Sequence, residues 1–194
     1  NRKEAAGFTP LLYAAKSGLW STCVLLLTTE PMGRNLAVDV QTATGWSMLL
    51  MMCTAERPEG SALDEFLSLF RLIHSRGVDY GSVSKHGETA LHYAALSDNI
   101  HAVQFLLVNA PIPVDAVNDL GESALHNAVR AGHVESAMLL LEYGANPLLS
   151  TASRSAASGG PTTPLQELER RVGMDTTPAQ EQLLARMAEA AEAR

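Results

Sequence analysis

The chain has 194 residues, enough for one domain or two small ones, which argues against a multidomain enzyme. Hydrophobic residues make up 46% and charged residues 18%, a composition typical of a folded chain, and no run approaches the roughly 18 consecutive apolar residues of a membrane-spanning helix. Lys and Arg number 14 against 21 Asp and Glu, a net charge of −7, which argues against binding to a nucleic-acid backbone.

One nine-residue pattern recurs along the chain, and each copy begins with glycine. A Thr or Ser follows two residues later, and its hydroxyl can accept a hydrogen bond from the free amides of a first helical turn. The copies therefore predict helices that begin just after Thr9, Ser47, Thr89 and Ser123. A second apolar run follows each copy, at residues 23–27, 66–73, 103–107 and 137–141. Each unit is predicted to be a helix, a turn and a second helix, stacked on its neighbours.

A fifth, degenerate copy begins at Thr163 and leads to a last amphipathic helix from about Pro178. Thr163 and Gln166 have the spacing of a capping box, and so do Thr177 and Gln180, which predicts a helix N-terminus at each of these two places.

The segment 121–147 reads G-E-S-A-L-H-N-A-V-R-A-G-H-V-E-S-A-M-L-L-L-E-Y-G-A-N-P and resembles the repeat of ankyrin-repeat proteins. The third copy follows that pattern well, whereas Leu12 and Leu50 replace the motif His in the first two. The resemblance implies an all-α fold, an ankyrin-repeat solenoid of stacked helix-turn-helix units with short β-hairpin or loop connections. We expect a single domain over residues 1–194, with units at about 5–38, 39–80, 81–114 and 115–147, a linker at 148–162 and a C-terminal cap at 163–194.

Two segments depart from the repeat. Residues Glu56–Asp64 are an insertion between the helices of the second unit, and the resemblance implies that this turn borders the concave groove. Residues Thr151–Thr163 are rich in Ser, Thr, Gly and Ala and are expected to form a mobile linker.

The chain contains no phosphate-loop, zinc-protease or serine-hydrolase motif, and its histidines have no ligand partners at recognisable spacing. The resemblance assigns His92 and His126 to hydrogen bonds with the backbone of neighbouring hairpins, and gives His133 a structural role at the turn. We therefore predict no enzyme activity, no cofactor and no metal site. Cys23 and Cys53 lie in apolar runs, which favours a reducing compartment, cytoplasmic or nuclear.

In ankyrin-repeat proteins, partners contact the hairpin tips and the exposed face of the first helix. The resemblance therefore implies a monomeric, non-catalytic interaction module without membrane insertion, which binds a peptide or folded protein on its concave surface. Aromatic residues beside an acidic strip predict a partner with hydrophobic and basic residues, unless Phe8 and Trp46 fold back onto the repeats. Two alternatives are a targeting or regulatory domain of a larger enzyme, and an enzyme whose site no motif reveals. The candidate binding residues are Phe8, Lys16, Thr44, Trp46, Lys85, His86, Glu88, Leu96, Asp119, Leu120, Glu122 and Arg130.

Overall fold

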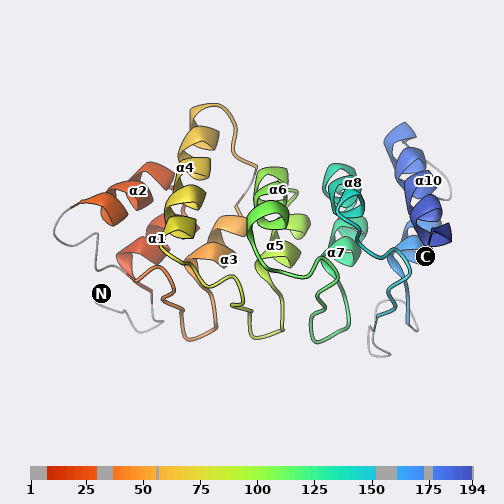
Figure 1. Ribbon diagram of the computed structural model, residues 1–194, viewed down its shortest axis with the longest axis horizontal. Coiled ribbons are helices and arrows are strands. Elements are labelled where there is room, and N and C mark those ends of the chain that lie inside the picture. Colours follow the sequence, from red (N-terminus) through yellow and green to blue (C-terminus); the bar gives the residue numbers. More distant parts are fainter. Residues whose placement is uncertain (1–7, 30–36, 56, 152–160, 173–176, 194) are drawn as a thin grey trace.

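The computed structural model describes residues 8–29, 37–55, 57–151, 161–172 and 177–193. In this part of the chain, helices follow one another in pairs and no strand is present beyond an isolated antiparallel bridge between Val117 and Ser123. Figure 1 shows the pairs stacked in a row, with the odd-numbered helices between a layer of hairpin loops and a layer of even-numbered helices. The predicted all-α architecture is confirmed. The helices are α1 (Pro10–Lys16), α2 (Trp20–Thr28), α3 (Met48–Cys53), α4 (Ser61–Ser75), α5 (Ala90–Leu96), α6 (Ile100–Asn109), α7 (Ala124–Ala131), α8 (Val134–Glu142), α9 (Pro164–Arg171) and α10 (Pro178–Glu192).

The first helix of each pair begins where the hydroxyl pattern predicts. The hydroxyls of Thr9, Ser47 and Thr163 accept from a backbone N–H three residues later. Thr163 and Thr177 head complete capping boxes, each with a glutamine at its third helical residue. These bonds satisfy amides that an isolated helix leaves free, so each helix start is fixed by local sequence.

Small residues allow the first helices to pack closely. Ala94, Ala95 and Ala128 are fully buried, and α3 has no exposed residue. Leucines, phenylalanines and other large side chains of the second helices fill the remaining space, and one continuous core runs through every described repeat. Stability therefore comes from the interfaces between neighbours.

Helix α4 is displaced from its regular position in the row. It packs closely on α2. Its contact with α3, its partner in the pair, is much weaker than the contact within the other pairs, and its contact with α6 is much weaker than that between α6 and α8. Aromatic side chains fill part of the space, with the rings of Phe70 and Phe105 4.7 Å apart. A groove of about 210 Å³ remains between α4 and α6, lined partly by Leu67 and Val108.

The insertion in the second unit differs from the expectation in two ways. Residues Ser61–Asp64 are helical and form the first turn of α4. This makes α4 longer than the second helices of the other three full pairs. The loop that precedes α4 lies at the end of the helices opposite the hairpins (Figure 1), away from the surface that the hairpins form. Its Arg57 pairs with Glu135 of α8 at 2.8 Å.

Most of the predicted linker at 148–162, namely residues 152–160, lies outside the described residues, as does Glu56. The numerical boundaries of the single domain and its units remain predictions.

Candidate partner-binding surface

The hairpins and the first helices together form one face of the molecule, which we call the hairpin–helix surface. The hairpin turns before α3, α5 and α7 are each closed by a backbone hydrogen bond across four residues. The N–H of Ser84 donates to the carbonyl of Glu88 at 2.9 Å, and the N–H of Asn118 donates to the carbonyl of Glu122 at 3.0 Å. Gly87, inside the turn before α5, has a φ of 74°, a left-handed conformation that favours glycine.

His92 fastens one repeat to the next. The backbone N–H of Thr89 donates to Nδ1 of His92 at 3.2 Å, so Nδ1 is unprotonated and Nε2 carries the hydrogen. Nε2 then donates to the carbonyl oxygen of Glu122 at 2.8 Å. One imidazole thereby caps its own helix and holds the following hairpin, as the resemblance implies.

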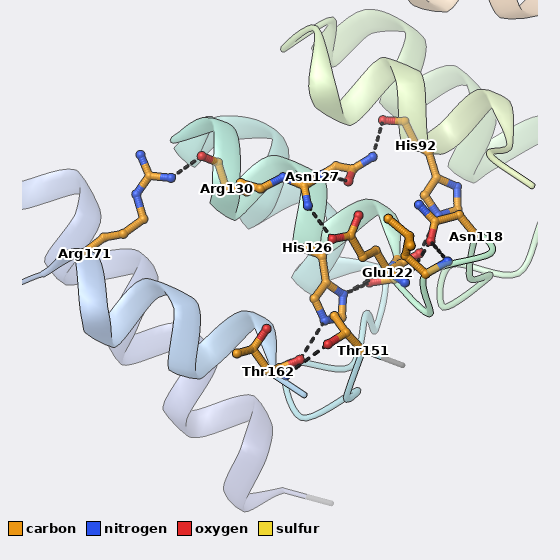
Figure 2. Close-up of polar contacts among 11 residues, drawn as sticks. His92, Asn118, Glu122, His126, Asn127, Arg130, Thr151, Thr162 and Arg171 are labelled. Carbon is orange, nitrogen blue, oxygen red and sulfur yellow. Dashed lines mark hydrogen bonds and ion pairs between the residues drawn. The ribbon is translucent and has the colours of Figure 1, made fainter. Parts of the chain in front are cut away.

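His126 repeats this arrangement one unit later, between Ser123 and the carbonyl of Thr162 (Figure 2). Burial lowers the pKa of both His92 and His126 below the ordinary value, although hydrogen bonds to Glu122 and Thr162 carbonyls act in the opposite direction. The lowered pKa favours the neutral form of both imidazoles at pH 7, and both ring nitrogens of each are engaged in hydrogen bonds within the fold.

The aromatic candidates pack against the repeats. Trp46 is partly buried, and its ring lies 4.8 Å from that of Tyr93 in the next repeat. Phe8 lies 4.9 Å from Tyr13, and the Lys16 ammonium lies 5.4 Å from the Phe8 ring centroid. The alternative in which these aromatics fold back is thus the one observed, and both side chains remain partly exposed.

Of the acidic strip predicted along this surface, Asp119 is exposed, whereas Glu122 and Glu88 are engaged by the fold. The carboxylate of Glu122 is buried, with 4% of its side chain exposed, and it pairs with Arg130. Glu88 is partly buried and accepts a hydrogen bond from the Tyr93 phenol, whose pKa burial and this contact raise to about 12. The expectation of an acidic groove is therefore wrong for these two residues, because the fold uses both carboxylates internally.

The hairpin tips are exposed, as a binding surface requires. A backbone hydrogen bond of 3.1 Å from Asp119 to the carbonyl of His86 ties the third tip to the fourth. The exposed candidates at these tips are Thr44, Lys85, His86, Asp119 and Leu120.

A row of exposed side chains also runs along the first helices. Each member stands seven residues after the helix N-cap of its unit, and every one is exposed, although most residues of α1, α3, α5 and α7 are buried. Leu96, at 40% exposure, is the apolar member. The row consists of Lys16, Thr54, Leu96, Arg130 and Arg170.

Comparison with protein families identifies these repeats. Residues 59–151 match the family model for ankyrin repeats, in three copies. The chain contains ankyrin repeats. No curated protein was found to match it.

Several residues that hold this ankyrin array together were missed in the sequence. The side-chain oxygens of Ser84 and Asn118 accept from backbone N–H groups four residues later, at 3.3 and 3.0 Å. Thr42 makes the equivalent bond at 3.1 Å. The available signal was an oxygen-bearing side chain three residues before the motif glycine in three successive units.

A second set, of which only His133 was expected to be structural, closes the far ends of the first helices. Asn99 donates to the carbonyl of Ala55 at 3.3 Å, and His133 donates to that of Leu96 at 3.0 Å. In the cap, Arg171 donates to the carbonyl of Val129 and to that of Arg130, as Figure 2 shows. Helix C-termini have free carbonyls. Because Asn, His and Arg satisfy them in different units, no recurring residue in the sequence marked these contacts.

The reactive groups of the ankyrin repeats are inaccessible. Cys23 and Cys53 are buried free thiols, and burial raises the pKa of both, that of Cys23 to about 12. Among the described residues, no three His, Cys, Asp or Glu side chains are grouped to hold a metal ion. None of the described helices has the length and apolar character needed to cross a membrane.

Proposed function

We propose that this ankyrin-repeat chain is a non-catalytic interaction module that binds a segment of another protein on its hairpin–helix surface. Ankyrin repeats are generally protein-interaction modules. The observation that carries the proposal is the exposure of Leu96, an apolar side chain at 40% exposure on a helix that is otherwise buried. It lies in a row with basic and polar side chains, a mixture that suits a protein partner.

The surroundings of Leu96 support the same surface. Trp46 and Tyr93 form a rigid aromatic pair at the junction of the second and third repeats, and tryptophan and tyrosine are enriched where binding energy concentrates. The buried thiols and the neutral, internally bonded histidines leave these groups unsuited to catalysis. We further propose that the chain acts as a monomeric adaptor or scaffold in the cytoplasm or nucleus, where unpaired cysteines persist.

Affinity capture with two matched variants tests the proposal. Leu96→Ser removes an exposed apolar side chain from the hairpin–helix surface, and Val108→Ser removes one of 62% exposure from α6, on the other layer. Capture from an extract of the source organism, followed by mass spectrometry, should identify proteins that Leu96→Ser loses and Val108→Ser keeps. Equal capture of every partner by the wild type, Leu96→Ser and Val108→Ser would refute this binding surface.

A further inference from the structure

The charge that the hairpin–helix surface exposes is mainly positive. Three of the residues singled out there are exposed cations, namely Lys16, Lys85 and Arg130, whereas Asp119 is the exposed carboxylate of the set. The two glutamates are shielded by the contacts described above. The set as a whole holds three cations and three carboxylates, and its exposed charge is mainly positive because Glu122 is buried and Glu88 is partly buried.

Arg130 is held in position before any partner arrives. One guanidinium nitrogen pairs with Glu122, and the other donates to the side-chain oxygen of Asn127 at 2.8 Å (Figure 2). The side chain is still 46% exposed. A guanidinium has five N–H donors, so further donors remain for a ligand, and a side chain that is already ordered loses little conformational entropy when it binds.

The neighbours of Arg130 in the exposed row define a linear pattern. Leu96 occupies the same position one unit earlier, and Arg170 occupies it one unit later. Glu167, on the same helix as Arg170, is partly buried. Packed helices lie about 8–10 Å apart, and an extended peptide advances about 3.3 Å per residue, so one unit corresponds to about three residues of such a peptide.

We propose that the partner segment is an extended acidic peptide, with an apolar residue on Leu96 and a carboxylate about three residues away on Arg130. A second carboxylate about three residues further binds Arg170. This inference rests on the proposed function and names the chemistry of its ligand. Carboxylates suit this site because arginine binds them with charge-assisted hydrogen bonds, which are stronger than neutral ones.

The buried carboxylate of Glu122 provides a sharp test of the sign of the ligand. It lies directly against Arg130 and opposes an incoming anion while attracting a cation. Glu122→Gln keeps the size and a hydrogen-bond acceptor but removes that charge. Tighter binding of the variant therefore indicates an anionic ligand, and weaker binding indicates a cationic one.

The experiment begins with a phage-displayed library of random 12-residue peptides, selected on the full chain. We expect enriched peptides to carry more Asp and Glu than Lys and Arg, with an apolar residue about three positions from an acid. The most enriched peptide is then labelled with a fluorophore, and its affinity for each variant is measured by fluorescence anisotropy, with circular dichroism as the check on folding.

Three variants and a control separate the outcomes. We expect Glu122→Gln to bind the peptide more tightly, Leu96→Ser to bind it less tightly, and the Glu122→Gln, Arg130→Gln double variant to bind about tenfold less tightly than wild type. The double variant removes both charges of the pair, so it leaves no unpaired buried charge. Arg186→Gln, at an arginine of 53% exposure on α10, should bind as wild type does.

Basic enriched peptides, or wild-type affinity in the double variant, would overturn the inference. If either result were found but Leu96→Ser still weakened peptide binding, the proposed function would stand and only the acidic character of the ligand would be refuted. Failure to enrich any peptide, or binding that none of these variants alters, would overturn both. Binding of a fluorescent single-stranded or duplex DNA that requires Arg130, with no acidic peptide selected, would replace the peptide with a nucleic acid.

Discussion

The imidazole of His92 and the carbonyl of Glu122 are joined by a 2.8 Å hydrogen bond between residues 30 positions apart. The bond connects the start of α5 to the hairpin that precedes α7, and His126 repeats it one unit later. The carbonyl that His92 holds belongs to the residue whose carboxylate orients Arg130. The contact that keeps two repeats in register thus also positions a side chain of the proposed binding surface.

We expect His92→Ala to lower the free energy of unfolding by roughly 2–4 kcal/mol. The substitution leaves the buried carbonyl of Glu122 and the N–H of Thr89 without their partner, and an unsatisfied buried polar group costs about 1–3 kcal/mol. Urea denaturation followed by circular dichroism measures the change. His86→Ala, at an exposed hairpin tip, is the control and should stay within about 0.5 kcal/mol of wild type. Equal stability of the two variants would contradict this role for His92.

Stability should also fall in mild acid. The pKa values of His92 and His126 in the folded chain lie below the ordinary value of 6.5. Below pH 6.5 these two histidines bind protons in the unfolded chain but not yet in the folded chain. The free energy of unfolding therefore decreases as the pH falls from 6.5 to the lowered pKa values of the folded state. Urea midpoints between pH 8 and pH 5 measure this. The His92→Gln, His126→Gln double variant should depend less on pH, and an unchanged dependence would rule out these groups as its source.

Gly87→Ala should destabilise the chain more than Gly77→Ala. Both glycines have a left-handed backbone, with φ values of 74° and 72°, and an alanine in that conformation costs about 1–2 kcal/mol. A methyl group at Gly87 would also lie 3.2 Å from the amide nitrogen of Asp119 and 2.8 Å from its carboxylate, whereas nothing lies within 4 Å at Gly77. The difference in thermal unfolding midpoints isolates the crowding between hairpins. Identical midpoints would show that the hairpins move apart at no cost.

Neither cysteine should react with a thiol reagent in the folded protein. Cys23 and Cys53 are fully buried, and burial disfavours their thiolate forms, which are the reactive species. We expect Ellman's reagent to detect both thiols in 6 M guanidinium and neither within minutes in native buffer at pH 8. Immediate native reaction of either thiol would show that its helix opens readily.

The fold was largely predictable because its determinants are local and repeated. Thr9, Ser47 and Thr163 head helices wherever the pattern recurs, and Gly45, Gly87 and Gly121 supply left-handed turn residues two positions before Ser47, Thr89 and Ser123. The start of α4 was not predictable, because nothing in the repeat requires the extra residues Ser61–Asp64 to be helical.

The binding surface was less predictable than the fold. The sequence placed Glu122 and Arg130 among the candidates for the hairpin–helix surface, but both charges were counted as free. Whether a carboxylate is exposed depends on a partner eight residues away, and on burial that only the assembled stack creates. The same limit applies to Trp46, whose contact with Tyr93 joins two repeats.

The displaced helix α4 has a mechanical consequence. Couplings in a one-dimensional array act in series, so bending concentrates where neighbours touch least. That joint lies between α4 and α6, which divides the array into a short arm, α1–α4, and a long arm, α5–α10. The contact between Trp46 and Tyr93 crosses this joint, so we expect a ligand bound over Leu96 to restrict the angle between the two arms.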